Sequence, residues 1–360
     1  MPDAIRLRRL ALVTDAWPPQ VNGVAKTLAR LVDDLRTRGT RVLVLAPDSH
    51  RTIGLPSYSE IRIACDPWKN IGKLREFQPD AIHVATEGPI GVFASAWLTA
   101  RKMRFTTSFH TRYPEYLTAR FGVPVEWGYK AERWFHNRGE RTMVGTLSML
   151  KELKHMGVGR QLVHWPRGVD PEAFHPRFRN EALFDLPRPI WLNVGRVAVE
   201  KNLEDFLRLD LPGTKVVVGD GPSRAQLEKK YPDVVWRGYR FGEDLAAHYA
   251  SADCFVFPSR TETFGNVLLE SLAAGTPIGS VPAPGPSDLV QEGVNGAISE
   301  DLRAACLSAV NCSRESARAS ALPYTVRTCH DMFVSNLVPV HDGFAPLLPR
   351  RFECAETHAA

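Results

Sequence analysis

The sequence predicts an α/β protein made of two doubly wound domains, each built on a parallel β-sheet. Short apolar runs alternate with helix-like segments through most of the chain. Two such series follow one another, and residues 165–176, rich in proline and turn residues, separate them. The length of 360 residues suits two domains of about 150–200 residues each. We therefore expect two sheets with helices on both faces.

The first series opens as a βαβ unit. Residues 10–13 predict a buried strand, residues 23–35 a helix, and residues 41–46 the next strand, with Gly39 marking the end of the helix. This domain is placed at residues 1–170, and its hinge to the second domain lies near residue 170. Further short buried strands are expected at residues 81–84, 104–108 and 141–145.

The second domain is placed at residues 171–322. Its strands are expected at residues 190–194, 215–218, 234–236 and 254–257, and its helices at residues 203–209, 245–249 and 267–274. A C-terminal helix is expected within residues 323–340, and residues 341–360 carry proline, glycine and no periodicity. This last segment is expected to be a loosely ordered tail.

Composition and charge narrow the class of protein. The content of 44% hydrophobic and 24% charged residues is that of a globular protein, and no run of about 18 apolar residues is present. The start shows no apolar signal region, so we expect a cytoplasmic protein. The six cysteines lack C-x-x-C spacing, so neither a disulfide framework nor a zinc site is indicated. Residues 1–170 hold 26 Lys and Arg against 16 Asp and Glu, which suits a nucleic acid, an anionic membrane or an acidic substrate.

The most informative motif is a strand-to-helix turn in the second domain. Glu262 and Glu270 bracket seven residues, and Phe264, Gly265 and Asn266 open the helix between them. Such a turn lies at the carboxyl edge of an open sheet, where the free N–H groups of the helix favour anionic or hydroxyl-rich ligands. The competing interpretation is that Glu262 caps the helix and Glu270 lies on its solvent face.

Four further segments are candidates for binding a ligand or for setting the geometry between the domains. A loop at residues 15–24 ends in Gly23, which permits close approach of a ligand to backbone. His110 follows a strand end, and residues 167–176 form the hinge, to which we assign a geometric role. Arg196 and Lys201 flank a loop after the second domain's first strand. Fixed cations there can neutralise a departing pyrophosphate without a metal.

Together these segments resemble a retaining glycosyltransferase of the GT-B architecture, in the group 1, or family 4, enzymes that carry the E-x7-E motif. The resemblance runs from about residue 10 to about residue 337. It implies a fold of two Rossmann-like domains facing a central cleft, and a nucleotide-sugar donor, UDP- or GDP-linked, as substrate. There is no D-x-D motif of the kind that metal-dependent sugar transferases use. We therefore expect no metal and no cofactor.

The resemblance also assigns roles to residues. It implies that Gly23 lies beneath the donor phosphates, that His110 lies near the donor sugar, and that the leaving phosphate acts as base in a front-face reaction. Glu262, with the backbone of residues 264–266, would hold the sugar hydroxyls, and Glu270 the ribose. Gly238 and Tyr239 are expected as walls of the nucleotide pocket.

The acceptor must be recognised mainly by the N-terminal domain. Asp15 is a tentative acceptor-site residue, because its loop borders the acceptor site in the family. Residues 121–139 mix aromatic and cationic side chains, which can lie on an anionic bilayer or, alternatively, form core and solvated surface. The members proposed to face the membrane are Trp127, Lys130, Arg133, Trp134 and Arg138.

Among family members the motifs look most like bacterial glycolipid-forming and α-mannosyl-transferring enzymes. Our first expectation is hexosyl transfer to diacylglycerol or a related lipid by a protein held peripherally at the inner face of the cell membrane. The close alternative is a GDP-mannose-dependent α-mannosyltransferase acting on a glycolipid or saccharide. An epimerase, a phosphorylase and a non-enzymatic nucleic-acid-binding module are weaker alternatives, since the last leaves the carboxylate turn and the Arg196–Lys201 loop unexplained.

Overall fold

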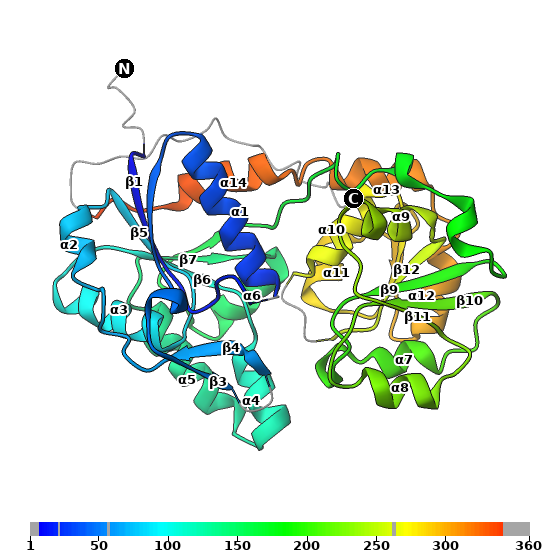
Figure 1. Ribbon diagram of the computed structural model, residues 1–360, viewed down its shortest axis with the longest axis horizontal. Helices are drawn as coiled ribbons and strands as arrows, with labels where there is room; N and C mark the ends of the chain where they lie inside the picture. The colour runs from blue at the N-terminus through cyan, green and yellow to red at the C-terminus, as the bar shows by residue number, and fades with distance from the viewer. Residues whose placement is uncertain (1–6, 21, 56–57, 261–263, 341–360) are drawn as a thin grey trace.

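The computed structural model describes residues 7–20, 22–55, 58–260 and 264–340 and has two α/β lobes side by side (Figure 1). Each lobe is built on a six-stranded sheet whose neighbouring strands are all parallel. The predicted fold class of two doubly wound domains is therefore confirmed.

The first sheet has the strand order β2-β1-β5-β6-β7-β8. Its strand β1 lies between two packed layers, because side chains alternate across a strand. Leu10 and Leu12 pack with the helix at residues 23–37, whereas Ala11 and Val13 pack with the helix at residues 89–100. The strands are β1 (Arg9–Val13), β2 (Arg41–Leu45), β5 (Ala81–Val84), β6 (Thr106–Phe109), β7 (Arg141–Val144) and β8 (Leu162–His164). The helices are α1 (Gly23–Thr37), α2 (Lys73–Phe77), α3 (Pro89–Ala100), α4 (Tyr113–Phe121), α5 (Val125–His136) and α6 (Leu147–His155).

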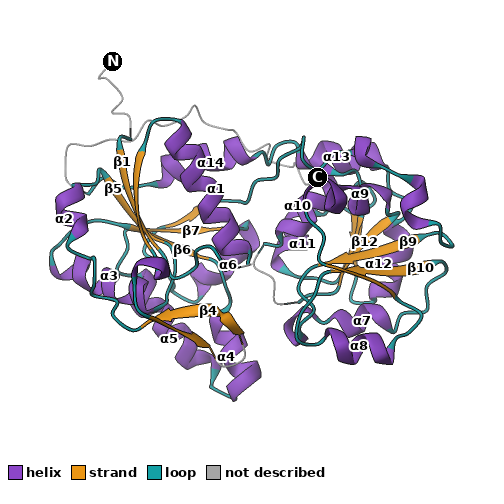
Figure 2. Ribbon diagram, viewed as in Figure 1, coloured by secondary structure: helices purple, strands orange, loops and turns teal. Residues whose placement is uncertain are grey.

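The second sheet has the strand order β11-β10-β9-β12-β13-β14, the arrangement of dinucleotide-binding folds. Helices lie on both sides of its strands (Figure 2). The chain leaves β9 towards β10 on one side and returns after β11 to β12 on the other side of β9, so the loops after β9 and β12 border one crevice. The strands are β9 (Ile190–Val194), β10 (Thr214–Val218), β11 (Val235–Gly238), β12 (Cys254–Phe257), β13 (Ile278–Ser280) and β14 (Gly296–Ile298). The helices are α7 (Leu203–Leu207), α8 (Arg224–Lys230), α9 (Gly242–Ser251), α10 (Asn266–Ala273), α11 (Pro284–Leu289), α12 (Leu302–Ala309) and α13 (Arg314–Ala321).

The predicted C-terminal helix is α14 (Val326–Asn336), and it packs on the first domain rather than the second (Figure 1). Phe333 and Leu337 share a core cluster with Leu28 of α1 and Trp165. Burial of two such apolar side chains stabilises the first domain by several kcal/mol, taking about 2 kcal/mol for each. The first domain is thus completed by residues from the far end of the described chain.

The chain crosses between the domains twice, and the two crossings run side by side. Val169 N donates to Tyr324 O at 2.9 Å, and Val326 N donates to Val169 O at 3.2 Å. Gly168 is needed for this approach, because a Cβ there would lie 2.5 Å from Val326 Cα. The hinge is therefore a paired segment rather than a single linker.

The structure contains further elements that the sequence analysis did not predict. Among them are the strands β8, β13 and β14, the antiparallel pair β3 (Thr52–Leu55) and β4 (Tyr58–Ala64), and the helix α4. The helix α5 lies within residues 121–139, the aromatic and cationic segment already singled out in the sequence. Within the described residues, four short 3-10 helices occur at Pro47–Ser49, Pro176–Phe178, Glu181–Phe184 and Val199–Lys201 (η1 to η4). None of the helices in the described ranges combines the length and the apolar character that a bilayer crossing requires.

Candidate active site

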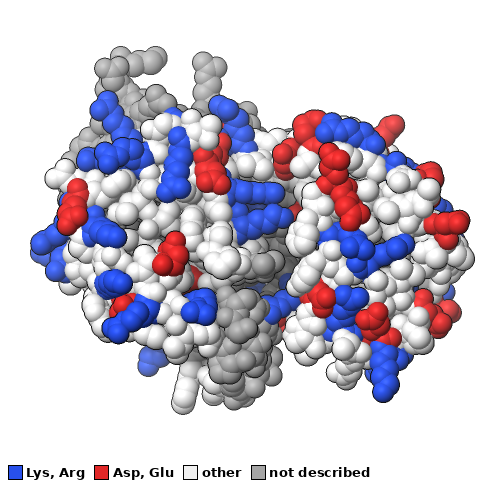
Figure 3. Space-filling model, viewed as in Figure 1, with Lys and Arg blue, Asp and Glu red and all other residues white. Residues whose placement is uncertain are grey.

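The candidate site lies where the carboxyl edges of the two sheets face each other. The starts of α1 and α10, one from each domain, meet there. A Cβ on Gly23 would lie 3.6 Å from Asn266 Nδ2, and Lys26 Nζ lies 3.8 Å from Glu270 Oε1. Lys and Arg side chains border the hollow between the lobes (Figure 3), and Lys26, Arg30 and Arg167 line a pocket there.

The start of α10 is built to leave backbone donors open. Gly265 precedes it with φ 81°, a left-handed conformation that favours glycine. In the described chain no side chain caps this end, and no acidic residue lies in its first turn. Phe264 is buried and faces Gly145 of the other domain, where a Cβ would lie 3.5 Å from it. Free N–H groups at such an end attract an anion.

Glu270 lies on the buried side of α10, so the interpretation that it faces solvent is wrong. Its Oε2 accepts a hydrogen bond of 3.0 Å from the Tyr249 hydroxyl, and its Oε1 faces Lys26 of α1. Glu270 therefore links the second domain's core to the first domain's helix start. Glu262, the other carboxylate of the motif, lies outside the described residues.

The cationic loop after β9 holds Arg196 and Lys201. Gly195 precedes Arg196 with φ 156°, and Lys201 ends η4. Both side chains are half-buried at the carboxyl edge of the second sheet. Gly238 and Tyr239 lie at the end of β11, where Gly219 N donates to Gly238 O at 2.8 Å and the Tyr239 hydroxyl donates to Asp220 O at 3.3 Å. Tyr239 also stacks on Phe241, with the ring centroids 6.0 Å apart.

His110 lies at the end of β6 in a directional chain of hydrogen bonds. Arg167 Nη2 contacts His110 Nδ1, and because a guanidinium can only donate, this nitrogen accepts. His110 Nε2 therefore carries the proton and donates to Ser108 Oγ at 2.8 Å. The Ser108 hydroxyl donates to Ala85 O at 3.3 Å, and His83 continues the series with Nε2 3.0 Å from Ser108 Oγ and Nδ1 2.8 Å from Thr106 Oγ1.

The protonation state of the two histidines in this hydrogen-bonded series follows from their burial. Burial first, and then Arg167, hold the pKa of His110 well below its usual value, and the same two causes lower the pKa of His83 to about 3. Both imidazoles are therefore neutral at pH 7. His110 has one fixed tautomer, assigned by Arg167.

Arg167 is the functional residue that sequence reasoning missed, because the hinge suggested only a geometric role. It is 8% exposed, and its guanidinium lies 4.6 Å above the Trp165 ring. Burial lowers the pKa of Arg167 to about 10, and no carboxylate pairs with it within the described ranges. A buried cation without a carboxylate partner at an interdomain pocket is a signal for an anionic ligand, but it becomes visible only in the folded chain.

The Asp15 carboxylate is hydrogen-bonded within the first domain, at the start of α3. Its carboxylate accepts hydrogen bonds from the backbone of Ile90 at 2.9 Å and Gly91 at 3.1 Å, and from the Thr86 hydroxyl at 3.1 Å. Burial raises the pKa of Asp15 despite these bonds. Asp15 thus positions the start of α3 beside the first domain's switch point.

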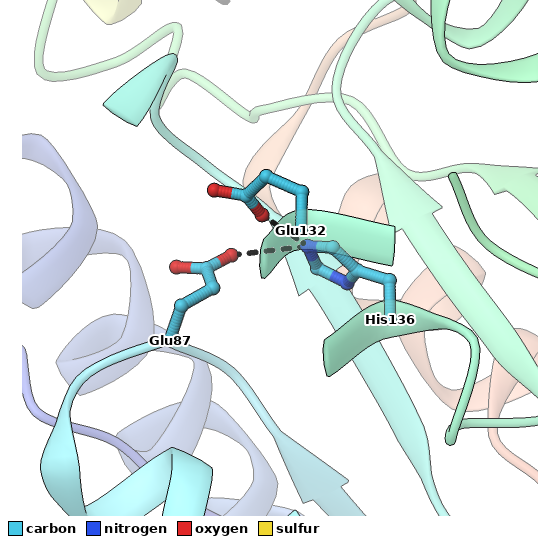
Figure 4. A group of neighbouring side chains, drawn as sticks. All are labelled: Glu87, Glu132 and His136. Carbon is cyan, nitrogen blue, oxygen red and sulfur yellow. Dashed lines mark ion pairs between the residues drawn. The ribbon is translucent and has the colours of Figure 1, made fainter. Parts of the chain in front are cut away.

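A buried carboxylate–histidine cluster lies in the first domain, outside every motif of the sequence (Figure 4). His136 Nε2 lies 3.1 Å from Glu87 Oε1 and 3.2 Å from Glu132 Oε2. Burial and the neighbouring Glu132 raise the pKa of Glu87 to about 7. Burial alone would lower the pKa of His136, but its two glutamate neighbours raise it to about 9.

The outer face of α5 carries most of the residues proposed to meet a membrane. Trp127 is 70% exposed and Trp134 is 43% exposed, and Lys130 lies between them. The Arg138 guanidinium lies 3.6 Å above the Trp134 ring. Arg133 differs, because its Nη1 donates to Met156 O at 3.3 Å and so holds the end of α6.

This fold and this site define a glycosyltransferase of the GT-B architecture. Two family models match the chain: "Glycosyltransferase Family 4" over residues 21–173 and "Glycosyl transferases group 1" over residues 188–312. The chain belongs to this family.

Relatives and solved structures agree with this assignment. A GDP-mannose-dependent α-mannosyltransferase of Mycobacterium tuberculosis is 33% identical over 78% of this chain and 81% of its own length. An α-monoglucosyldiacylglycerol synthase of Streptococcus pneumoniae is 26% identical over 84% of this chain and 78% of its own. The structure of a sucrose-phosphate synthase from Thermosynechococcus elongatus matches with a TM-score of 0.74 at 18% identity, covering 90% of this chain and 96% of that one. The predicted enzyme class and architecture are confirmed.

Proposed function

We propose that this protein transfers a mannosyl group from GDP-mannose, with retention of configuration, to a lipid acceptor at the inner face of the cell membrane. The observation that carries the proposal is the meeting of two helix starts, α1 at Gly23 and α10 at Gly265, between two cationic surfaces. A nucleotide diphosphate fits between them because both helix dipoles and the nearby cations stabilise negative charge there.

Different residues bind the donor and stabilise its leaving group. Arg196 and Lys201 neutralise the departing diphosphate from the second domain, and the backbone at the start of α10 donates hydrogen bonds to it. Glu270 accepts from the ribose, and Glu262 from a sugar hydroxyl. Arg167 adds a fixed charge from the hinge and orients His110 beside the sugar. The acceptor hydroxyl attacks on the face from which the diphosphate leaves, and a phosphate oxygen takes its proton.

The relatives support the choice of donor. Proteins named as GDP-mannose-dependent α-mannosyltransferases share about a third of their aligned residues with this chain. A second candidate is transfer from a UDP-hexose to diacylglycerol, which is favoured by the α-monoglucosyldiacylglycerol synthase among the relatives. The exposed Tyr239 and Phe241 pair at the end of β11 offers a stacking surface for either base.

Membrane contact is proposed for the outer face of α5. Trp127 and Trp134 are placed to enter the interface between headgroups and acyl chains, while Lys130 and Arg138 meet anionic headgroups. Insertion of two aromatic rings and contact of two cations with the headgroups hold the enzyme on the membrane surface, where the lipid acceptor lies. Lys130 and Arg138 each contribute about 1 kcal/mol when they lie near an anionic surface.

The function is tested by incubating the purified protein with vesicles of anionic phospholipid that contain diacylglycerol or a monohexosyl-diacylglycerol. GDP-mannose, UDP-glucose, UDP-galactose and UDP-glucuronate are supplied in turn, and glycolipid is followed by mass spectrometry and its anomeric configuration by NMR. A mannosyl lipid with α configuration is expected. Product from a UDP-hexose alone would replace the donor assignment, and nucleotide release without a lipid product would move the acceptor to a soluble saccharide.

The membrane face is tested separately by vesicle sedimentation. Trp127→Ser combined with Lys130→Gln should reduce sedimentation with anionic vesicles, while binding of the donor nucleotide stays unchanged. Leu322→Ser, an exposed apolar residue of the second domain, is the matched control and should sediment as the parent does. Equal sedimentation of all three proteins would contradict the proposed face.

A further inference from the structure

The cluster of Glu87, Glu132 and His136 is not used by the transfer reaction. Glu87 follows β5, and Glu132 and His136 lie four residues apart on α5, so the latter two share one face of that helix. The three side chains point towards one another (Figure 4). One ligand atom from each lies within 4.8 Å of the other two.

The cluster is buried, and the polar atoms at its centre lack hydrogen bonds. The side chains of Glu87, Glu132 and His136 are 10%, 5% and 0% exposed. Neither oxygen of Glu87, nor Glu132 Oε2, nor His136 Nε2 has a hydrogen-bond partner among the described residues. Both carboxylates face the same imidazole nitrogen, so the three side chains present oxygen and nitrogen donor atoms to one buried point.

The distances between the donor atoms match the ligand-to-ligand distances around a bound metal ion. Ligand atoms about 2.1 Å from a first-row ion lie about 3.0–3.4 Å apart for angles between the octahedral and tetrahedral values. The two distances from His136 Nε2, 3.1 Å and 3.2 Å, fall in this range. Thr107 Oγ1 lies 2.9 Å from His136 Nδ1 and so holds Nε2 towards the carboxylates, as an outer partner of a metal-bound histidine does.

We propose that Glu87, Glu132 and His136 form a binding site for a divalent first-row transition-metal ion. Two carboxylate oxygens and one imidazole nitrogen suit Mn²⁺, Fe²⁺ or Zn²⁺ better than Ca²⁺, which takes six to eight oxygen ligands. The ion takes the place of the proton on His136 and ties the loop before α3 to α5. It belongs to the first domain and stabilises that domain, whereas the leaving group is neutralised by the second domain's cations.

The site is tested with protein purified without chelator and then dialysed to remove metal. Mn²⁺ binding is followed by the loss of the free-ion EPR signal, Zn²⁺ binding by calorimetry, and thermal unfolding is recorded with each ion and with Ca²⁺. We expect one Mn²⁺ or Zn²⁺ per chain and a higher Tm with either ion but not with Ca²⁺.

Variants separate this site from adventitious binding. Glu87→Gln and Glu132→Gln keep the side-chain shape and should each weaken binding at least tenfold. Thr107→Val keeps all three ligands and should weaken binding about 10–100-fold through loss of the outer partner. Asp244→Asn, which removes a carboxylate beside a single histidine, His248, is the matched control and should bind as the parent does.

Two results would overturn the proposal. Equal binding by the parent and the two glutamine variants would place any ion elsewhere. No binding and an unchanged Tm in the parent would leave the imidazolium proton of His136, facing the two glutamates, as the occupant of the cluster.

Discussion

Replacing Arg167 by methionine should cost little stability and much activity. The guanidinium is buried in the hinge, where it contacts His110 Nδ1, Trp165 O at 3.4 Å and the Trp165 ring. Methionine keeps an unbranched stem that can still lie on the indole. The change therefore removes mainly a buried positive charge and its hydrogen bonds.

The two energetic effects nearly cancel. Burial lowers the pKa of Arg167 well below its usual value, to about 10. A cationic group whose pKa is lowered by folding destabilises the folded state at every pH below its folded pKa, here by roughly 3 kcal/mol at pH 7. Against this relief stand the lost hydrogen bond to His110, about 1.5–3 kcal/mol, and the lost contact with the Trp165 ring, about 1 kcal/mol. We expect the free energy of unfolding of Arg167→Met to stay within about 2 kcal/mol of the parent.

Activity should respond differently, because His110 loses the donor that fixes its tautomer and the pocket loses a fixed charge. We expect kcat/KM to fall at least tenfold, which corresponds to about 1.4 kcal/mol of transition-state stabilisation. Unfolding in urea measures the stability, and nucleotide release in the presence of acceptor vesicles measures the rate.

Arg314→Met is the control for this prediction. Burial also lowers the pKa of Arg314 to about 10, but its guanidinium donates to the carbonyls of Ala252 and Ala250, at 2.7 Å and 2.5 Å, in the second domain's core. It should lose stability and keep its rate per folded molecule. The reasoning on Arg167 would be refuted by an unchanged kcat/KM, or by a loss of more than about 4 kcal/mol of stability in Arg167→Met.

Three other changes test the site, the buried histidines and the hinge. Arg196→Ala should lower the transfer rate at least tenfold through lost stabilisation of the leaving diphosphate; steady-state turnover equal to that of the parent would exclude this role. The pKa of His83 is about 3 in the folded chain and about 6.5 when unfolded, so its contribution to stability is complete above pH 6.5 and is lost as the pH falls below it. Between pH 7.5 and 5.5 the free energy of unfolding of the parent should therefore fall by about 1.4 kcal/mol more than that of His83→Asn. If the urea midpoints of the two proteins shifted equally between these pH values, the neutral state of the buried His83 would be contradicted. Gly168→Ala places a Cβ 2.5 Å from Val326 Cα and should cost about 1–3 kcal/mol, whereas Gly72→Ala meets no atom within 4 Å and serves as its control; equal Tm values would show that the two crossings can separate without cost.

Local patterns in the sequence are sufficient to predict the alternation of strands and helices. The run at residues 10–13 is apolar because β1 is covered on both faces, and the helix at residues 266–273 begins at a glycine that takes a left-handed conformation. Because parallel strands carry their ligands at the carboxyl edge, the sequence is enough to place the loops at Gly23, Arg196 and Gly265 at the carboxyl edges of their own sheets. That the two edges face one cleft is implied only by the resemblance to the family.

Contacts between distant residues cannot be predicted in the same way. Arg167 and His110 are 57 positions apart, and nothing in either segment indicates that the hinge guanidinium would lie beside a histidine instead of a carboxylate. Glu87 and His136 come from different elements, so their burial against each other follows from packing of α5 on the first sheet. Glu270 is ambiguous in the sequence because an apolar helix can turn either side towards solvent, and only the second domain's core decides which.

The return of α14 to the first domain limits how this enzyme can be dissected. A fragment ending at residue 170 would lack Phe333 and Leu337 and so expose the apolar side of α1 and Trp165 to water. The second domain, in contrast, is one continuous segment. It can be excised for studies of the nucleotide alone, whereas an independent first domain calls for a circular permutant in which α14 is joined directly to the strand β1.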